Sequence, residues 1–590
     1  MNLRKTKIIC TMGPAVKNLE TIKKLLMEGM NIARFNFSHG DHDYHKEMMD
    51  IVREASRQTS IPAALLIDTK GPEIRTGIVK DDKKLNLVRG EKIIVTTDEV
   101  DCTEKILSIS YKNLPHEISK GKHIYIADGL VDLEVEKTDG NDIYCTIING
   151  GQIGSKKNVN VVGIKTSLPA VTEQDVKDII FGIEHNVDFI AASFIRKPLD
   201  VKEIRGLIDI CDARVDIISK IENEEGLENI DEIIRVSNGI MVARGDLGVQ
   251  IQMEEIPLVQ KRIVLKCNQA NKPVIVATQM LDSMINNPKP TRAEATDVAN
   301  AIFDGADAIM LSGETASGKY PVMAVKTMHE IATNIEKSSE YMENTRISRE
   351  SFQNVNMADT IARASYDIAM NIKADAILTP TLHGTTPKLI SRYRPIQNII
   401  AVTTTPEVQR KLLLYWGIVP VISNLMPDSD AMINNAIKSS MDRGYIKNFD
   451  KIVMVAGVPV NSPIMLNMIK VHLISNVLAK GTRGYGDIAS GRIVKVNSLE
   501  EAEDLIKGDE DEILLAKYID ESFKPILKRI KGYILEEFSS ISWEEVKAEN
   551  PDIVVIAGAE NAMTLLEDNL TVTLDGKEKL VYEGMIRVDE

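Results

Sequence analysis

Short apolar runs that end in polar or glycine residues recur along the first 315 residues of the chain. They are too short for helices and mostly rich in β-branched residues, so we expect buried strands. There are eight of them, at residues 7–10, 32–35, 64–67, 189–192, 217–219, 240–242, 274–277 and 308–311. The stretches between them, such as 19–27, 176–183 and 298–303, space their apolar residues as one face of a helix does. This alternation predicts eight β/α units that close into a barrel.

The pattern changes between the third and fourth runs, which lie about 120 residues apart. Residues 72–165 alternate apolar and polar positions between turn signals, which predicts an inserted all-β domain. After about residue 350, strand-like runs at 376–378, 398–402, 419–422 and 451–455 indicate a second α/β domain. A glycine-rich stretch, 481–486, predicts a hinge before the last block. The predicted domains are a barrel (1–71 and 166–345), a β-barrel lid (72–165), an α/β domain (346–480) and a C-terminal domain (481–590).

Composition narrows the class of protein and its partners. The 590 residues carry 71 Lys and Arg against 86 Asp and Glu, a net charge of −15, with 44% hydrophobic residues, as in ordinary globular proteins. The negative balance argues against nucleic acid as a partner. The sequence has no signal peptide and no apolar run of the about 18 residues that a membrane helix needs. The five cysteines never form a CxxC pair, so we expect neither disulfides nor a zinc site. Together, these features predict a soluble, cytoplasmic protein.

Charged and polar residues gather at the carboxyl ends of the predicted barrel strands, where barrel enzymes place their active sites. Any one of these ends could be a solvated turn, but six on one rim predict a site. They are residues 34–40, 68–75, 219–222, 243–248, 277–279 and 312–314. Glu222 and Asp246 are hard oxygen ligands without nearby Cys or His, which suits Mg²⁺ or Mn²⁺. Arg34, Arg75 and Lys220 supply positive charge for an anion.

Basic residues beside a hard divalent cation are the equipment of phosphoryl transfer, in which positioning and charge neutralisation do most of the catalytic work. The stretch Arg244-Gly245-Asp246 lies where a helix N-terminus could present backbone N–H groups to a carboxylate or a phosphate. The residues alone therefore indicate phosphoryl transfer as the class of reaction.

At these positions the sequence closely resembles the pyruvate kinase family. The most specific motifs are Lys220-Ile221-Glu222-Asn223 and Thr278-Gln279-Met280-Leu281, and the resemblance covers about 475 residues. It implies a (β/α)8 TIM barrel with an inserted β-barrel lid and an α/β effector domain, in agreement with the strand pattern. It also implies transfer of the phosphoryl group of phosphoenolpyruvate to ADP, giving pyruvate and ATP in the final step of glycolysis. The family relationship implies allosteric regulation and a homotetramer.

The resemblance assigns roles to the residues that match the family's motifs. It implies that catalysis and substrate binding fall to Lys220, Arg34, Thr278, Gly245 and Asp246. It implies a proton relay through Thr278 whose outer members are Ser312 and Glu314. It implies Mg²⁺ or Mn²⁺ on Glu222 and Asp246. It implies that the nucleotide is held by Asn36, His39, Arg75 and, from the lid, Lys157.

A monovalent cation is also implied. The residues that match the family's K⁺ site supply only oxygen ligands, and they are Asn36, Ser38, Asp68 and Thr69. In this family a Glu beside that site goes with a K⁺ requirement and a Lys with independence of K⁺. Glu73 therefore predicts K⁺ dependence.

Two regions depart from the family pattern. The loop 379–386 is similar to the family's phosphate-binding effector loop, but His383 stands where Ser is usual, and Val-Asn-Ser-Pro at 460–463 replaces a glycine-rich loop. The effector therefore stays open, and the candidate effector-binding residues are Thr379, Thr381, His383, Gly384 and Thr385. The last block resembles the swivelling phosphohistidine domain of phosphoenolpyruvate-utilising enzymes. Since residues 481–590 contain no histidine, we expect a structural or allosteric role, with Trp543 in the core or an interface.

Two other functions compete with this interpretation. A non-catalytic effector-binding protein could keep the fold, although the intact Lys220, Glu222, Asp246 and Thr278 argue against loss of catalysis. A barrel lyase or aldolase could use Lys220 as a Schiff-base amine, which would require a lowered lysine pKa.

Overall fold

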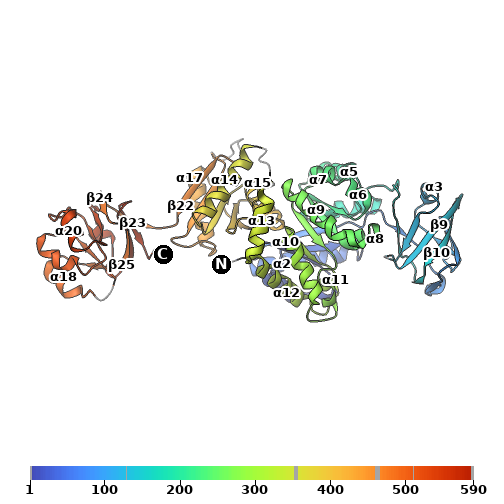
Figure 1. Cartoon of the computed structure of the whole chain (residues 1–590), viewed down its shortest axis with the longest axis horizontal. Helices are drawn as coiled ribbons and strands as arrows, with labels where there is room; N and C mark the ends of the chain where they lie inside the picture. Colours follow the sequence, from blue (N-terminus) through green and yellow to red (C-terminus); the bar gives the residue numbers. More distant parts are fainter. Residues whose placement is uncertain are drawn as a thin grey trace. The chain divides into compact units, whose positions relative to one another are not determined.

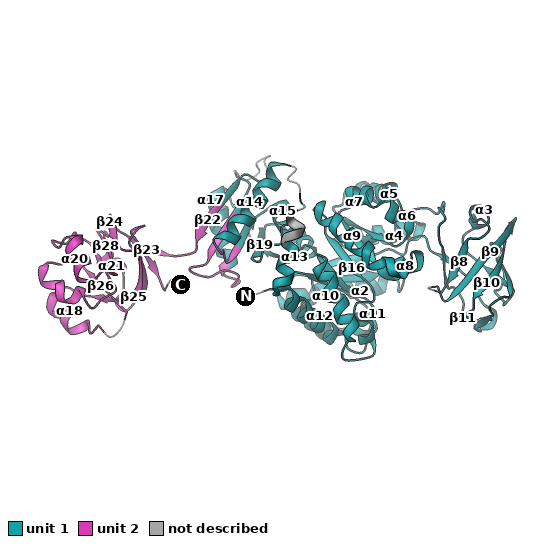
Figure 2. Ribbon diagram, viewed as in Figure 1, with its two compact units in different colours: residues 1–372, 377–440, 455–469 teal, residues 373–376, 441–454, 470–590 magenta. Residues whose placement is uncertain are grey.

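The structure is a computed structural model that describes residues 3–127, 129–350, 352, 356–458, 466–508 and 511–585. The chain divides into two compact units (Figure 2): residues 1–372, 377–440 and 455–469 form the first, and residues 373–376, 441–454 and 470–590 form the second. Within the described part of the chain, no helix combines the length and the apolar character needed to cross a bilayer.

The first sheet is a closed barrel of eight parallel strands in the order β1-β17-β16-β15-β14-β13-β3-β2. Its segments are coloured blue and green in Figure 1. All eight predicted runs are confirmed as strands, with ends that move by two residues at most. The strands are β1 (Lys7–Thr11), β2 (Ile32–Asn36), β3 (Ala64–Asp68), β13 (Phe189–Ala192), β14 (Asp216–Ile221), β15 (Gly239–Ala243), β16 (Val274–Ala277) and β17 (Ala308–Leu311).

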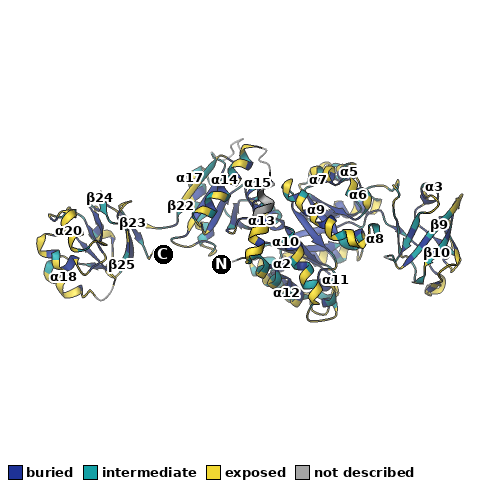
Figure 3. Ribbon diagram, in the orientation of Figure 1, coloured by how far each residue is buried: buried dark blue, intermediate teal, exposed yellow. Residues whose placement is uncertain are grey.

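Amphipathic helices connect the barrel strands and bury their apolar faces against them, while their outer faces are exposed (Figure 3). Side-chain caps start several of them: Thr172 and Asp175 form a capping box on α4, and Thr291 and Glu294 form one on α10. The helices are α1 (Leu19–Met27), α2 (His42–Thr59), α4 (Glu173–Glu184), α5 (Pro198–Ile210), α6 (Glu224–Glu228), α7 (Ile230–Val236), α8 (Arg244–Gln250), α9 (Ile256–Gln269), α10 (Arg292–Phe303), α11 (Gly313–Ala316) and α12 (Pro321–Glu336).

The insertion after β3 is all-β apart from the short α3 (Leu114–Glu117), as predicted. Its strands form a seven-stranded sheet, β4-β12-β8-β9-β10-β6-β7, and a two-stranded one, β11-β5. Gly140 adopts the positive φ of +57° that the β9–β10 hairpin turn requires. The strands are β4 (Ile74–Arg75), β5 (Leu85–Leu87), β6 (Lys92–Thr96), β7 (Ile106–Ser108), β8 (His123–Ile126), β9 (Val131–Asp139), β10 (Asp142–Asn149), β11 (Gly151–Ile153) and β12 (Asn158–Val161).

The second α/β region has a five-stranded sheet in the order β20-β19-β18-β21-β22. The four predicted runs of this region are confirmed as strands. The strands are β18 (Ala376–Pro380), β19 (Asn398–Thr403), β20 (Ile418–Ile422), β21 (Lys451–Ala456) and β22 (Met468–Leu473), and the helices are α13 (Ser339–Glu350), α14 (Met357–Asn371), α15 (Thr385–Ser391), α16 (Pro406–Lys411) and α17 (Ser429–Met441).

The last sheet has eight strands in the order β23-β30-β29-β25-β26-β27-β28-β24. It carries the helices α18 (Leu499–Leu505), α19 (Lys524–Leu527), α20 (Trp543–Glu549) and α21 (Ala562–Leu565). The strands are β23 (Val477–Lys480), β24 (Arg483–Tyr485), β25 (Ile488–Lys495), β26 (Glu512–Ala516), β27 (Gly532–Leu535), β28 (Val554–Ala557), β29 (Thr571–Asp575) and β30 (Leu580–Glu583).

The predicted hinge at 481–486 is wrong, because this stretch contains β24, an edge strand that pairs with β28. Its glycines permit close backbone approach rather than flexibility: a Cβ on Gly484 would lie 2.3 Å from the carbonyl oxygen of Gly576. β23, which precedes residue 481, already belongs to the same sheet. Trp543 packs as predicted, since its ring stacks on Tyr485 with centroids 4.8 Å apart.

Candidate active site

A cluster of four buried charges lies at the carboxyl ends of the barrel strands. The ammonium of Lys220 on β14 donates to Asp68 Oδ1 at 3.0 Å and lies 2.9 Å from Glu222 Oε1. Arg34 on β2 donates from Nε to Asp68 Oδ2 at 2.7 Å, and from Nη1 to Thr11 Oγ1 at 2.8 Å. Parallel strands of a closed barrel end on one rim, which is why residues far apart in sequence meet here.

The charges of this cluster set the protonation of its members. Burial would lower the pKa of Lys220, but Asp68 and Glu222 raise it above the ordinary lysine value. Burial would raise the pKa of Asp68, but Lys220 and Arg34 hold it below its ordinary value. Lys220 is therefore a fixed positive charge. A Schiff-base amine needs the opposite shift, which argues against the lyase or aldolase interpretation.

The neighbouring positive charge does not fully offset the cost of burying the Glu222 carboxylate. Burial, opposed by Lys220 and reinforced by the charge of Asp246, raises the pKa of Glu222 to about 7. Its Oε2 accepts a hydrogen bond from the backbone N–H of Phe194 at 2.7 Å. Phe194 has a φ of 55°, a conformation that side chains other than glycine rarely adopt and that signals a constrained position.

The donor set fits a divalent cation such as Mg²⁺. Among the described residues, no three His, Cys, Asp or Glu side chains form a ready-made metal cluster. Mg²⁺ does not need one, because it usually binds one or two carboxylates and takes its other oxygens from water and substrate. Glu222 is buried and Asp246, in the first turn of α8, is exposed, so the two carboxylates offer one inner and one outer ligand. A cation here would also relieve the charge deficit of Glu222.

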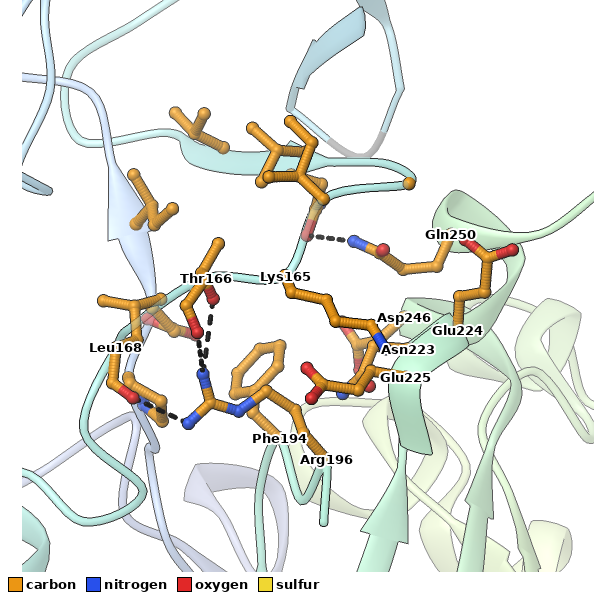
Figure 4. A pocket seen from close by; sticks show the side chains of 18 of the residues that line it. Lys165, Thr166, Leu168, Phe194, Arg196, Asn223, Glu224, Glu225, Asp246 and Gln250 are labelled. Atoms are coloured by element: carbon orange, nitrogen blue, oxygen red, sulfur yellow. Dashed lines mark hydrogen bonds between the residues drawn. The ribbon is translucent and has the colours of Figure 1, made fainter. Parts of the chain in front are cut away.

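Asp246 lies on a cleft of about 310 Å³ between the barrel and the lid (Figure 4). Gln250 of α8 donates to Asn160 of the lid strand β12 at 3.3 Å. Arg196 holds the segment that leads back from the lid, since its guanidinium donates to the carbonyl oxygens of Thr166 at 3.1 Å and Leu168 at 2.7 Å. The lid thus meets the barrel beside Asp246, one of the two predicted ligands of the divalent cation.

Thr278 follows β16 in a strained conformation, with a φ of 69° that is unusual for a β-branched residue. Its hydroxyl accepts a hydrogen bond from the backbone N–H of Gly245 at 2.8 Å, and its carbonyl oxygen accepts one from Arg244 at 2.7 Å. Arg244 is in turn paired with Asp297 at 2.7 Å. These contacts hold Thr278 against Gly245.

Ser312 and Glu314 lie together at the end of β17. Glu314 is almost fully buried, and its carboxylate accepts hydrogen bonds from the backbone N–H groups of Ser312 at 2.7 Å and Leu281 at 3.0 Å. Burial raises the pKa of Glu314. The hydroxyl oxygen of Ser312 is buried and makes no hydrogen bond with any described residue. It therefore has unused capacity for a water or a substrate atom.

The four residues predicted to bind K⁺ lie at the ends of β2 and β3, where Asn36 is the register partner of Asp68. Asn36 Oδ1 accepts a hydrogen bond from the backbone N–H of Ser38 at 3.1 Å. Thr69 is buried, and its carbonyl oxygen accepts a hydrogen bond from Ser193 Oγ at 2.6 Å. Neutral oxygens with one carboxylate suit a monovalent cation. Glu73 is paired with Arg75 at 2.7 Å.

The predicted nucleotide contacts lie outside the buried cluster. Arg75 is on the lid strand β4 and donates to the carbonyl oxygen of Lys156 at 2.9 Å as well as to Glu73. Lys157 on the lid is exposed, and so is His39 in the turn between β2 and α2. The structure therefore brings Lys220, Arg34, Asp68 and Glu222 into one cluster, while Lys157 and His39 are exposed and Arg75 is partly exposed.

Only some of the predicted effector residues line a cavity of about 290 Å³ in the α/β domain. Thr381, His383 and Thr385 line it. Thr379 is fully buried and donates to the carbonyl oxygen of Ile400 at 3.3 Å, away from this lining. Gly384 caps α15 with a φ of +76°, and its N–H donates to Thr381 Oγ1. The segment 460–463 lies outside the described residues.

Sequence reasoning missed three residues that support the cluster. Thr11 is the last residue of β1, and Ser193 and Phe194 directly follow β13. Ser193 Oγ lies 2.8 Å from Lys220 Nζ. The ends of β1 and β13 were not among the six strand ends that the sequence analysis singled out. Applying the same rule to every strand end would have found these residues.

An eight-stranded barrel with a buried lysine, an arginine and paired carboxylates at its carboxyl rim defines a barrel enzyme equipped for phosphoryl transfer. Comparison with known proteins gives the same class. The family models that match are pyruvate kinase, barrel domain, at residues 3–325, pyruvate kinase, alpha/beta domain, at 359–472, and PEP-utilising enzyme, mobile domain, at 508–579.

Full-length relatives are similar over nearly the whole chain. A pyruvate kinase of Geobacillus stearothermophilus is 45% identical over 98% of this chain and 99% of that protein. One of Staphylococcus aureus (strain MRSA252) is 42% identical over 99% of this chain and all of that protein. The crystal structure of a pyruvate kinase from Cryptosporidium parvum superposes with a TM-score of 0.76 at 40% identity, covering 80% of this chain and 96% of that one. The chain belongs to the pyruvate kinase family and is a phosphotransferase of that kind.

Proposed function

We propose that this chain transfers the phosphoryl group of phosphoenolpyruvate to ADP, giving pyruvate and ATP. The observation that supports this most is the cluster of Lys220, Arg34, Asp68 and Glu222, in which a lysine is held charged at the mouth of the barrel. The similarity to pyruvate kinases over the whole chain supports the same reaction.

Lys220 and Arg34 stabilise the negative charge of the reaction. The enolate of pyruvate and the transferring phosphoryl group both carry such charge, and a preorganised cation in a site without bulk water stabilises it more strongly than water does. Because the contacts of Lys220 to Asp68 and Glu222 fix its ammonium, little reorganisation is needed when the charge develops.

Glu222 and Asp246 bind Mg²⁺ or Mn²⁺ together with the substrate. The divalent cation supplies charge neutralisation for the carboxylate, enolate and phosphate oxygens. The backbone around Gly245 binds the substrate carboxylate, and Asp246 lies one residue further on in the first turn of α8. The cleft between lid and barrel, which Asp246 lines, is where lid closure excludes water from the phosphoryl donor.

Asn36, Ser38, Asp68 and Thr69 bind K⁺. In the family that this chain belongs to, a Glu at the position of Glu73 goes with a K⁺ requirement, and here its carboxylate pairs with Arg75. We therefore expect the reaction to depend on K⁺ as well as on Mg²⁺.

Thr278, Ser312 and Glu314 deliver the proton that converts the enolate into pyruvate. The hydroxyl of Thr278 lies at the rim, and the unused hydroxyl of Ser312, next to the buried Glu314, can hold a water between them. Burial raises the pKa of Glu314, so its carboxyl holds a proton more readily than an exposed glutamate does.

ADP binds between the barrel rim and the lid through Asn36, His39, Arg75 and Lys157. Asn36 and His39 belong to the barrel, and Arg75 and Lys157 belong to the lid, which agrees with a lid that closes after the nucleotide enters. The cavity of the α/β domain that Thr381, His383 and Thr385 line binds an effector, and the described residues of its lining include no Lys or Arg. We further propose a cytoplasmic homotetramer.

The test is a coupled assay of pyruvate formation from phosphoenolpyruvate and ADP, with and without Mg²⁺ and K⁺. The proposal requires turnover that collapses when either ion is replaced, K⁺ by tetramethylammonium and Mg²⁺ by a chelator. Absence of pyruvate under all these conditions would refute it. Borohydride trapping with substrate discriminates the lyase, because only that function gives a stable adduct at Lys220.

A further inference from the structure

Ser193 is a buried serine directly after β13 that no predicted role uses. It is 4% exposed. Its hydroxyl oxygen lies 2.8 Å from Lys220 Nζ, 2.6 Å from the carbonyl oxygen of Thr69 and 3.2 Å from Asp68 Oδ1. One hydroxyl thus contacts the lysine of the cluster and two residues predicted to bind K⁺.

The direction of these hydrogen bonds follows from the donors. The ammonium of Lys220 has three N–H groups and no lone pair, so it donates to Ser193 Oγ as well as to Asp68 and Glu222. The single hydrogen of the Ser193 hydroxyl then goes to one acceptor. The shortest contact is the carbonyl oxygen of Thr69, so the chain runs from Lys220 through Ser193 to Thr69.

Ser193 cannot move easily from this position. Gly71 has a φ of +71° and packs so closely that a Cβ on it would lie 2.9 Å from Ser193 Cβ. The next residue, Phe194, is held at a positive φ and donates its backbone N–H to Glu222. The turn after β13 is therefore tied to the carboxylate, the ammonium and the carbonyl at once.

We propose that Ser193 is a positioning residue for Lys220 that also orients the carbonyl oxygen of Thr69 toward a monovalent cation. Its hydroxyl accepts the third hydrogen bond of the Lys220 ammonium and so fixes the orientation of that group. It also couples binding of the monovalent cation to the position of the ammonium charge. This rests on the proposed function, since Lys220 acts there on the substrate and Thr69 on K⁺.

The test compares Ser193→Ala with Ser219→Ala in the full-length protein. Ser219 is a matched control because it is fully buried, precedes Lys220 on β14 and spends its hydroxyl on Ser237 Oγ at 2.7 Å, away from the cluster. Each substitution deletes one buried hydroxyl. Hydrogen bonds to charged groups contribute enough for a ten- to hundredfold effect, so we expect kcat of Ser193→Ala to fall about that far, with the KM for ADP within about twofold of wild type. We expect kcat of Ser219→Ala to stay within about twofold of wild type.

A second readout does not use turnover. The thermal midpoint of each protein is measured without substrate against KCl, with tetramethylammonium chloride holding the ionic strength constant. Because a ligand that binds only the folded state stabilises it by RT ln(1 + [K⁺]/Kd), the KCl concentration at which the midpoint begins to rise reports cation affinity. We expect this concentration to rise about tenfold in Ser193→Ala and to stay unchanged in Ser219→Ala.

Each result decides the proposal. Equal behaviour of the two variants in kcat and in the KCl titration overturns it, and so does a loss of kcat in Ser193→Ala with an unchanged titration. Should Ser193→Ala fail to fold, Ser193→Cys keeps the volume with a weaker hydrogen-bonding group, and an effect in the same direction on both readouts supports the proposal, whereas wild-type behaviour overturns it. If the wild-type protein forms no pyruvate, the proposed function fails, while the KCl titration still tests Ser193.

Discussion

Replacing Lys220 by methionine removes the one ammonium of the cluster while keeping most of the side chain's volume. In the wild-type structure this ammonium lies 3.0 Å from Asp68 Oδ1 and 2.9 Å from Glu222 Oε1. Asp68 keeps its contact with Arg34 in the variant, but Glu222 loses its cationic partner. The substitution therefore removes a charge from the place where the substrate's charge develops.

The expected loss of rate can be worked from these distances. Two unit charges about 3 Å apart interact by about 5.5 kcal/mol at an effective dielectric constant of about 20. Removal of a single positioned neutral donor from such a site costs about 2.7–4 kcal/mol. Because each 1.36 kcal/mol is a factor of ten in rate, we expect kcat to fall about 10²- to 10⁴-fold.

The assay is steady-state pyruvate formation at saturating phosphoenolpyruvate, ADP, Mg²⁺ and K⁺, with thermal unfolding of the same samples. Breaking a buried ion pair destabilises a protein by about 3–5 kcal/mol, so the unfolding curve separates lost folding from lost catalysis. Lys266→Met is the matched control, because its ammonium pairs with Asp231 at the surface of the barrel. A folded Lys220→Met protein that keeps more than a tenth of the wild-type kcat would refute the role of Lys220.

Three further predictions concern other parts of the chain. Glu73→Lys should keep most of its turnover when K⁺ is replaced by tetramethylammonium, whereas wild type should not; equal K⁺ dependence would contradict the role of Glu73. Burial, opposed by Arg410, raises the pKa of Asp188 from 3.8 to about 6. Its carboxyl therefore stabilises the folded state fully below about pH 4 and loses this contribution as the pH rises through 6. In chemical denaturation, wild type should lose about 3 kcal/mol of unfolding free energy relative to Asp188→Asn across that range, and a constant difference would contradict this prediction. Gly484→Ala should lower the unfolding midpoint of the C-terminal domain, because its Cβ would lie 2.3 Å from the Gly576 carbonyl oxygen. Gly206→Ala should not, because a Cβ there meets open space. Equal midpoints would contradict the close approach at Gly484.

The barrel could be predicted from the sequence because its strands are buried on both faces. A parallel strand between a helical layer and a barrel interior consists almost entirely of apolar residues, so each run stands out against the amphipathic helices. The same topology explains why the main residues of the cluster could be found. Arg34, Lys220 and Glu222 belong to strand ends, and the closed barrel brings such ends to one rim.

Other features could not be read from the sequence, for physical reasons. A glycine-rich stretch is compatible both with a flexible hinge and with a strand pressed against a neighbouring backbone, and only the contacts of Gly484 with Gly576 decide for the strand. Phe194 and Thr278 adopt positive φ values, which the identity of a bulky residue does not predict. The link from Lys220 through Ser193 to Thr69 joins three separate strands and becomes visible only when they are adjacent.

The central claim is that Lys220, Glu222 and Asp246 act together on an enol phosphate and a diphosphate acceptor. The most direct measurement is a ³¹P NMR time course of the full-length protein with phosphoenolpyruvate, ADP, Mg²⁺ and K⁺. The account predicts that the phosphoenolpyruvate signal falls while the γ-phosphate signal of ATP rises in equal amount, and that both changes stop without Mg²⁺. Release of inorganic phosphate in place of ATP, or no change in either signal, would contradict it.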